Sequence, residues 1–426
     1  MSILKDIHEL VNAELISDNQ ADKIREYYGK KNSHSNNRLF VVFGILGASL
    51  IGLGIILIIA HNWDDLSRLT KTIFAFIPLL IGQVLCTYTL IKKQDNQAWI
   101  EGSTAFLFFS VGASVSLVSQ IYHIPGNLSS FLLIWMLLCL PLVYVMKSSI
   151  GSLFYIIGIT YYACETGYWT YPAIESYYYW LLILAIFPHY YHLYKKRPES
   201  NFLIFHNWLL PLSVVITLGT LSDKRGEFMF IAYFSLFACL YILGNTAFFN
   251  QQKLRNKAYK ILGSLGTIIL LLVLSFDWFW EDLKDKTFHF NEIIVSPELL
   301  ASASLTLLAG ALLYLQQKNK KFLSIRPIPL IFIFFIYAFI TGLSSSFAMV
   351  LINLYGFTIG ILTIREGAKK EHLGILNFGL LIITALVTCR FFDESLSFVL
   401  RGILFVSIGV GFFATNYVML KKRKNE

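Results

Sequence analysis

The stretch LFVVFGILGASLIGLGIILIIA, residues Leu39–Ala60, contains no charged side chain in 22 positions. A helix rises about 1.5 Å per residue, so a helix of this length would cross the hydrocarbon core of a bilayer, which is about 30 Å thick. Short loops that carry charged residues flank this run and the apolar runs that follow it. The stretch therefore predicts a transmembrane helix.

Thirteen further apolar runs follow, most of them 16 to 23 residues long. We therefore predict an all-α fold, a polytopic transmembrane helix bundle of about 14 spans. The short fifth run and the tight turns at 147–148 and 344–346 make 12 spans the lower limit. The predicted spans cover residues 39–60, 69–91, 100–122, 129–146, 149–164, 177–193, 202–221, 228–249, 259–276, 298–315, 328–343, 346–364, 371–389 and 396–419.

The composition is that of a membrane protein. Hydrophobic residues make up 56% of the chain and charged residues 14%, about half the charged share of a soluble domain. The formal net charge of +9 does not indicate nucleic-acid binding, because the basic residues lie in the loops between spans and anchor the topology there. The five cysteines form no CxxC motif, so we predict neither a disulfide framework nor a zinc site, and no cofactor.

Lysine and arginine are distributed unevenly between alternate loops. With the amino terminus in the cytoplasm, the inner segments hold 27 of the 35 basic residues and the outer segments hold 8. Positive charge favours the cytoplasmic side of a membrane. We therefore predict that both termini are cytoplasmic and that the bundle spans residues 39–420. The basic tail 421–426 would then anchor the chain at the inner headgroups or bind a partner.

Residues 1–38 precede the first span and are predicted to form a cytoplasmic pair of amphipathic helices. Apolar residues between Ile3 and Val11 recur at helical spacing. A second helix is predicted to follow Ser17, because Gln20 stands three residues further on in a capping-box arrangement. Two such short helices would bury their apolar faces against each other, the membrane surface or a protein partner. The pair is therefore either a folded cap or a docking module.

Few polar residues lie deep inside the predicted spans, which counts against a proton-coupled pump, since such pumps usually carry carboxylates there. The third span is unusual because small residues follow a three- or four-residue spacing that only Phe109 interrupts. This stripe predicts either close helix packing or a helix that lines a cavity with Gln120 and His123 at its mouth. The stripe consists of Gly102, Ala105, Gly112, Ser116, Ser119 and His123.

The predicted topology places further polar residues at the same outer rim. Arg401 lies about a turn and a half inside the last span, where an arginine needs an acidic partner or an anionic ligand. Asp64, Asp65 and Asp393 are the candidate partners. We therefore predict a ligand-binding site where the outer ends of four spans meet. Its residues are Trp63, Asp64, Asp65, Gln120, Tyr122, His123, Arg390, Asp393 and Arg401.

Two other groups of polar residues allow a functional and a simpler interpretation. His189, His192 and His206 could bind a metal, but histidines beside a basic loop more often mark the headgroup boundary, so we predict no metal site. The loop Asp277–Glu298 holds six acidic residues against two lysines. We predict that this loop is solvated.

Four stretches carry a resemblance to a known family. They are LVNAELISDNQADKI (Leu10–Ile24), GLGIILIIAHNWDDL (Gly52–Leu66), SQIYHIPGN (Ser119–Asn127) and RFFDESLSFVLRGILF (Arg390–Phe405). The chain resembles the bacterial predicted-membrane-protein family called domain of unknown function 2157. The resemblance is strongest over residues 1–145 and, within the bundle, over residues 39–145. It implies a location in the bacterial cytoplasmic (inner) membrane and assigns no catalytic residue.

The leading functional hypothesis is transport or flipping of a small or lipid-linked anionic substrate that enters an outer-side cavity. Arg390 and Arg401 would supply positive charge, while Gln120, Tyr122 and His123 would orient the ligand. The lipid bilayer, an anionic lipid or lipid-linked substrate, and a protein partner at residues 1–38 are the expected partners.

Two alternatives belong to other classes. The first is a non-catalytic membrane scaffold or sensor that acts through its amino-terminal helices. The second is a transferase that uses a polyprenyl-phosphate sugar, in which Asp64 or Asp65 would be the acidic group of the first outer loop. That loop is short for an acceptor site, so an enzyme is the less favoured class.

Overall fold

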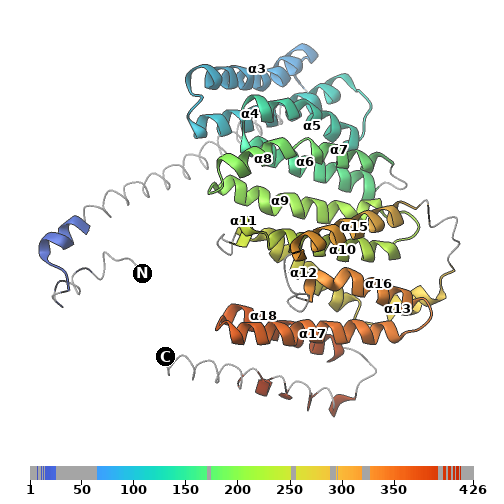
Figure 1. Cartoon of the computed structure of the whole chain (residues 1–426). Helices are drawn as coiled ribbons and strands as arrows, with labels where there is room; N and C mark the ends of the chain where they lie inside the picture. The colour runs from blue at the N-terminus through green and yellow to red at the C-terminus, as the bar shows by residue number, and fades with distance from the viewer. Residues whose placement is uncertain are drawn as a thin grey trace. The chain divides into compact units, whose positions relative to one another are not determined.

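The computed structural model describes most of the chain beyond residue 64. The described residues are 65–169, 174–250, 256–287, 296–318 and 327–391, together with residues 7, 11, 13, 15–24, 294, 397–399, 402, 403, 406, 407, 409–411 and 413. Within these residues every regular element is a helix (Figure 1), which agrees with the all-α prediction. The predicted first span, 39–60, and the basic tail, 421–426, lie outside the described residues, as does most of the last predicted span.

The helices follow the predicted apolar runs closely along the chain. They are α3 (Arg68–Lys92), α4 (Gln97–Tyr122), α5 (Leu128–Val145), α6 (Ser149–Tyr168), η1 (Ile174–Tyr177), α7 (Tyr178–Leu184), α8 (Phe187–Lys196), α9 (Asn201–Leu218), η2 (Gly219–Leu221), α10 (Glu227–Gly244), α11 (Ala247–Asn250), α12 (Ala258–Val273), α13 (Trp278–Asp285), α15 (Pro297–Gln317), η5 (Ile328–Leu330), α16 (Ile331–Gly342), α17 (Phe347–Lys369) and α18 (Leu373–Phe391).

Seven of the described helices are long and apolar enough to cross a membrane, namely α3, α4, α5, α9 with η2, α10, α15 and α17. An eighth span would result if α12 and α13, which meet at an angle of 73°, count as one broken span. The η5–α16 segment and most of α18 are apolar but shorter. Several membrane-crossing helices are therefore present, while fourteen spans and cytoplasmic termini stay predictions.

One predicted span, 177–193, is not a continuous helix. It is divided into α7 and α8, with a turn at Ala185 and Ile186. Pro188 stands at the start of α8, where its missing N–H group costs no helical hydrogen bond. A proline at this place ends one helix and starts the next.

Polar caps set the starts of several helices. The side chain of Asn96 accepts a hydrogen bond from the N–H group of Ala98 (3.1 Å) at the start of α4. Asn127 accepts from the N–H group of Ser130 (2.8 Å) at the start of α5. Ser148 caps α6 in the same way. Such residues satisfy backbone donors that have no partner inside the helix. The turns between helices are therefore encoded locally.

The chain divides into two compact units, Met1–Ile77 and Pro78–Glu426. In the first unit, residues 18–24 are helical, and the N–H group of Ser17 donates to the Gln20 side chain (3.0 Å), which agrees with the predicted capping arrangement. Ile7 and Ala21 are fully or almost fully buried. The amino-terminal segment therefore has packed apolar positions, while its predicted boundary at residue 38 lies outside the described residues.

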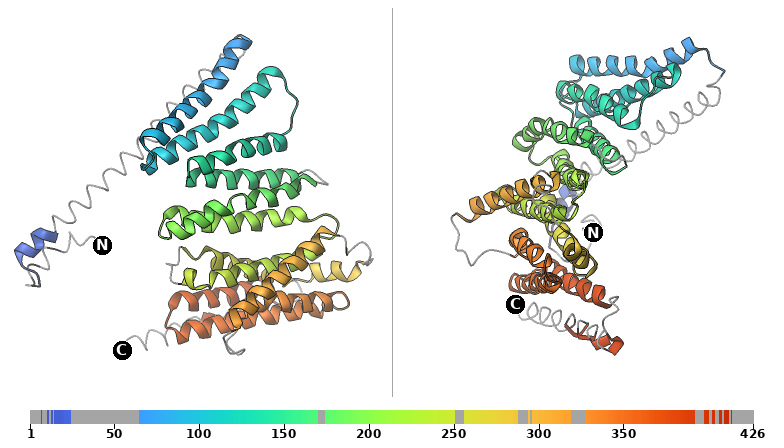
Figure 2. Two further views of the ribbon diagram at one scale, coloured as in Figure 1. Left: turned by 45° about the horizontal axis from the view of Figure 1, so that its top comes forward. Right: turned by 90° about the vertical axis from the view of Figure 1, so that its right-hand side faces the viewer.

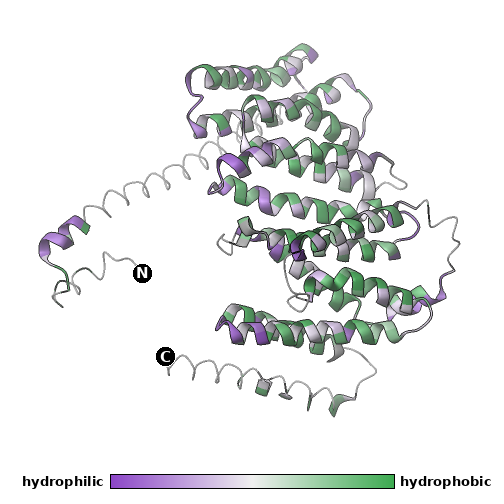
Figure 3. Ribbon diagram, viewed as in Figure 1, coloured by the Kyte–Doolittle hydropathy of each residue, from purple (hydrophilic) through white to green (hydrophobic). Residues whose placement is uncertain are grey.

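In the second unit, neighbouring helices pack on one another in succession (Figures 1 and 2). α4 packs on α5 and α6, α6 on α9, α9 on α10 and α12, and α16 on α17, which packs on α18. Many large apolar side chains point outwards, as Leu80, Val84 and Leu307 do. Figure 3 shows this apolar character along the helices, with hydrophilic residues at several helix ends. Such a surface suits a lipid environment.

Candidate functional site

The structure describes only part of the predicted outer rim. Gln120, Tyr122 and His123 are exposed at the end of α4 in the second unit, and Asp65 is exposed in the first unit. α4 packs mainly on α5 and α6, whereas α18, which carries Arg390, packs on α17 and α12. The convergence of the rim residues therefore stays a prediction. Trp63, Asp64, Asp393, Arg401 and the side chain of Arg390 lie outside the described residues.

The end of α4 is a tight helix cap. His123 adopts a left-handed conformation with φ 54° and ψ 38°. The N–H group of Ile124 donates to the Ser119 carbonyl (2.9 Å), and the Ser119 hydroxyl donates back to the Ile124 carbonyl (3.0 Å). This cap holds Gln120, Tyr122 and His123 together at one exposed helix end.

The small-residue stripe of α4 does not form one continuous packed face. A Cβ atom on Gly112 would lie 2.5 Å from the Trp135 ring, so this position requires a glycine for close helix packing. A Cβ atom on Gly102 would meet nothing within 4 Å, and Ser116 is exposed. The close-packing interpretation therefore holds in the middle of the stripe and not at its ends.

A row of polar side chains lies where α6 packs on α9, and α7 contributes one of them. The hydroxyl oxygens of Thr160 and Ser213 lie 2.6 Å apart, and the Tyr179 hydroxyl lies 2.7 Å from Ser213 Oγ. Nearer the start of α9, His206 Nε2 lies 2.9 Å from Ser152 Oγ. We call Ser152, Thr160, Tyr179, His206 and Ser213 the polar seam. All of them except the half-buried Thr160 are at most 1% exposed.

The spacing of residues along α9 explains why the seam forms. His206 and Ser213 are seven residues apart, and Thr217 follows Ser213 after four, so the three lie on one helix face. Beyond Thr217, α6 also lies close to η2, because a Cβ atom on Gly167 would lie 2.3 Å from Cβ of Thr220. This periodic row of polar residues is a signal in the sequence for a polar helix interface.

Two of the three histidines, His189 and His206, are buried between helices, whereas His192 is exposed. His206 is fully buried, and its second ring nitrogen, Nδ1, lies 2.7 Å from the Phe202 carbonyl oxygen. The His189 ring centroid lies 5.8 Å from that of His206, and His189 Nε2 is buried without a hydrogen-bond partner among the described residues. No group of three metal-binding side chains occurs in the part of the chain that the structure describes.

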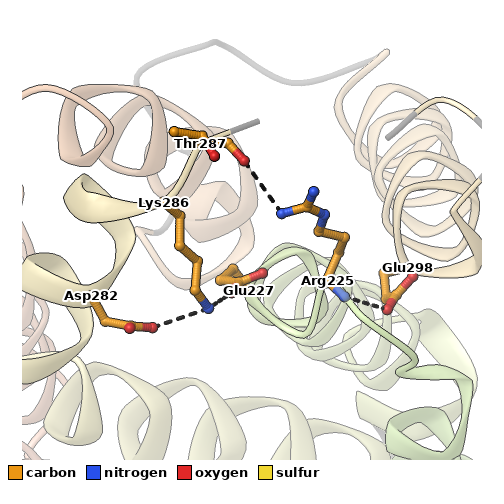
Figure 4. Close-up of polar contacts among 6 residues, drawn as sticks. All are labelled: Arg225, Glu227, Asp282, Lys286, Thr287 and Glu298. Carbon is orange, nitrogen blue, oxygen red and sulfur yellow. Dashed lines mark hydrogen bonds and ion pairs between the residues drawn. The ribbon is translucent and has the colours of Figure 1, made fainter. Parts of the chain in front are cut away.

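A buried carboxylate lies beyond η2, at the start of α15. Glu298 has no exposed surface, and its Oε1 accepts hydrogen bonds from the N–H groups of Asp223 (2.7 Å) and Arg225 (2.9 Å). Figure 4 shows the second of these contacts. The other oxygen, Oε2, is buried and has no hydrogen-bond partner among the described residues. Two backbone donors thus stabilise the charge on one oxygen only.

A second carboxylate, Glu227 at the start of α10, is 6% exposed and pairs with Lys286. The Lys286 ammonium also lies 3.1 Å from an Asp282 oxygen, as Figure 4 shows. In the loop Asp277–Glu298, Asp282 is exposed as predicted, but solvation is the wrong interpretation for Glu298. Its position as the second residue of α15 turns the carboxylate towards the backbone amides of another loop.

A third buried carboxylate lies at the opposite end of the predicted topology. Glu101 is 4% exposed and accepts hydrogen bonds from the N–H groups of Ser149 (3.0 Å) and Ile150 (2.8 Å), and from the Ser148 hydroxyl. It thereby compensates the partial positive charge at the start of α6. Glu101, Glu227 and Glu298 show that buried carboxylates exist at the helix ends.

Comparison with known proteins identifies one family. Residues 8–151 match the family model described as Predicted membrane protein (DUF2157). The resemblance predicted from the sequence is therefore confirmed for this region. No curated protein and no solved structure matches the chain.

The DUF2157 region includes α3, α4 and α5 and ends in the first turn of α6. It contains Glu101, the exposed end of α4 and the cap at Ser148. The whole polar seam, from Ser152 to Ser213, lies beyond it, as does Glu298. The family match thus supports a membrane protein, and the chemistry of the seam rests on the structure alone.

Proposed function

We propose that this membrane protein transports or flips a small or lipid-linked anionic substrate and that the polar seam forms part of the path. The supporting observation is that hydroxyl and imidazole groups gather where α6 packs on α9, with Tyr179 added from α7. Polar side chains within a bilayer are costly, so they face the protein interior and often mark a pathway for a polar solute. The exposed apolar surfaces of α3 and α15 have the opposite character.

The seam has the chemistry that such a path needs. In the packed state the hydroxyls of Thr160, Tyr179 and Ser213 satisfy one another. If α6 and α9 separate, the same groups become donors and acceptors for a substrate. The substrate then replaces hydrogen bonds that the opening breaks. Glu298 binds the loop that follows η2, and α15 contacts η2. Glu298 thereby links the end of the seam nearer Ser213 to α15.

The preference for an anion rests on the sequence prediction for the outer rim. In this proposal Arg390 and Arg401 attract the substrate, and Gln120, Tyr122 and His123 orient it at an outer-side cavity before it reaches the seam. Asp65 is exposed, which suits a binding rim as well as a solvated turn. No observation on the described residues favours the transferase alternative.

We also propose fourteen spans, cytoplasmic termini and a location in the bacterial inner membrane. The basic-residue distribution supports this orientation, and the contacts between turns join turns that the predicted topology assigns to the same side. The turns that precede α4, α6 and α9 meet through Gln97, Glu101 and Arg197, and all three are inner turns in the predicted topology. The outer turns after η2 and before α15 meet at Glu298.

Transport can be tested with the purified full chain in liposomes that contain fluorescent phosphatidylglycerol. We expect faster transbilayer movement of the probe than in protein-free vesicles. Ser213→Leu fills the seam with an apolar side chain. It should reduce the protein-dependent rate to about a tenth or less, because one lost polar contact in a path costs on the order of 1.4 kcal/mol or more. The matched control is Ser304→Leu, on the exposed face of α15.

Thermal unfolding in detergent must show that both leucine variants are folded. The transport proposal is wrong if wild-type vesicles move the probe no faster than empty ones. The role of the seam is wrong if Ser213→Leu transports as the wild type does, or if Ser304→Leu loses as much. Removal of residues 1–36 should leave the rate unchanged.

A scaffold or sensor role is the second candidate, because Ile7 and Ala21 are buried in the first unit and indicate a packed amino-terminal element. A protein partner would dock there. The liposome experiment separates the two functions, since a scaffold predicts no protein-dependent movement of the probe with either the full or the shortened chain.

A further inference from the structure

The turn between α3 and α4 borders a shallow, open polar hollow of about 570 Å³ that is lined by residues 91–97. Lys92 and Lys93 are exposed in its wall, and neither forms an ion pair with any residue that the structure describes. Asp95 is the one acidic residue in the lining. The hollow therefore has an excess of positive charge, and it is open to solvent or lipid headgroups.

A third cation is held at the edge of this hollow. Arg197, from the turn between α8 and α9, donates from Nη1 to the Gln97 side-chain oxygen (2.7 Å). The amide nitrogen of Gln97 donates in turn to Glu101 Oε1 (2.5 Å). Glu101 is buried and bound to the start of α6, so it is not exposed in the hollow. Gln97 thus fixes a guanidinium group at the edge of the hollow.

The surroundings of the hollow are those of a lipid contact. Tyr88 and Trp99 have their ring centroids 5.5 Å apart, and both side chains are exposed. Val84 and Ile91 are exposed on α3, the helix that ends in Lys92. Tyrosine and tryptophan are enriched where the headgroup region meets the hydrocarbon core. Cations at the end of such a surface fit a ligand that has both a phosphate and acyl chains.

We propose that this hollow binds the headgroup of an anionic glycerophospholipid. Lys92 and Lys93 contact the phosphate oxygens, Arg197 adds a planar donor pair from the side, and the acyl chains lie along Ile91 and Trp99. The predicted topology places the site in the inner leaflet. The proposal does not depend on transport, because a bound lipid can hold the α3–α4 turn and the α8–α9 turn together in any membrane protein.

The test is native mass spectrometry of the full chain, released from nanodiscs that contain phosphatidylglycerol or phosphatidylcholine. We expect retained phosphatidylglycerol and no comparable retention of phosphatidylcholine. The double variant Lys92→Gln with Lys93→Gln should weaken phosphatidylglycerol binding about thirtyfold, since each basic residue near a headgroup contributes about a factor of five. Arg197→Gln should weaken binding about fivefold on the same basis.

The chain offers a matched control pair at the end of α17. Lys369→Gln with Lys370→Gln removes the same charge from two adjacent lysines, of which Lys370 already pairs with Glu366 (2.6 Å). This variant should retain phosphatidylglycerol as the wild type does. Equal loss in both double variants would show non-specific attraction and overturn the proposal, as would unchanged binding in the Lys92/Lys93 variant. Displacement of the lipid by millimolar inorganic phosphate would show a site for free phosphate instead.

Discussion

The interface between α6 and α9 and the interface between α10 and α16 belong to the same unit, but their side chains differ in chemistry. The first is joined by hydrogen bonds such as that between Thr160 and Ser213. The second is filled by aromatic rings, with the centroids of Phe234 and Phe335 4.4 Å apart and both residues fully buried. One helix pair is thus held by directional contacts and the other by packed apolar volume.

This difference shows how a membrane protein can combine stability with a path for a polar solute. Lipid chains are as apolar as the helix surfaces, so helices associate through close packing and through polar contacts. Aromatic packing cannot be exchanged for contacts with a polar substrate. Hydroxyl groups can be, and each hydrogen bond between helices contributes only about 0.6 kcal/mol on average. We therefore expect the aromatic interface to dominate stability and the seam to dominate function.

The largest loss of stability is expected at the aromatic interface. Phe335→Ala should lower the free energy of unfolding by about 3–5 kcal/mol, because it removes a fully buried ring and leaves a cavity. Thermal or denaturant unfolding in detergent measures this loss. Phe347→Ala is the control, because it makes the same change at an exposed position of α17. A similar effect in both variants would mean that the α10–α16 packing is not a determinant of stability.

A smaller loss is expected where α12 meets α10. A Cβ atom on Gly263 would lie 2.6 Å from the Tyr241 nitrogen and 2.7 Å from the Phe237 oxygen, both of which are backbone atoms. Gly263→Ala should therefore destabilise the protein by about 1–3 kcal/mol through overpacking. Gly310→Ala, where nothing lies within 4 Å of the new atom, should cause no loss. The same unfolding measurement compares the two variants. A Gly263→Ala protein as stable as the wild type would contradict this packing.

The smallest effect on stability is expected in the seam. Ser213→Ala removes the side-chain contacts to Thr160 and Tyr179, so it should cost about 1 kcal/mol at two bonds of about 0.6 kcal/mol each. A double-mutant cycle with Thr160→Ala isolates the coupling of that pair. A loss as large as that of Phe335→Ala would remove the contrast between the two interfaces, and the seam would then be a structural core.

Much of the helical layout could be predicted from the sequence, because membrane helices require long apolar runs between polar turns. Each predicted span from residue 69 to residue 389 coincides with one or two of the described helices, and the capping contact between Ser17 and Gln20 is present. The partners of individual polar residues could not be predicted. Glu101 and Glu298 stand at predicted span ends, where a carboxylate is as consistent with solvent as with burial.

The sequence by itself determined that this chain is a helical membrane protein with a DUF2157 region, because hydrophobicity and length are local properties of the chain. Only the tertiary structure decided that α6 faces α9 through hydroxyl groups while α10 faces α16 through aromatic rings. It also decided that Glu298 is bound by the backbone of another loop. Such pairings depend on which helix faces turn towards each other, and a single helix period does not specify its neighbour.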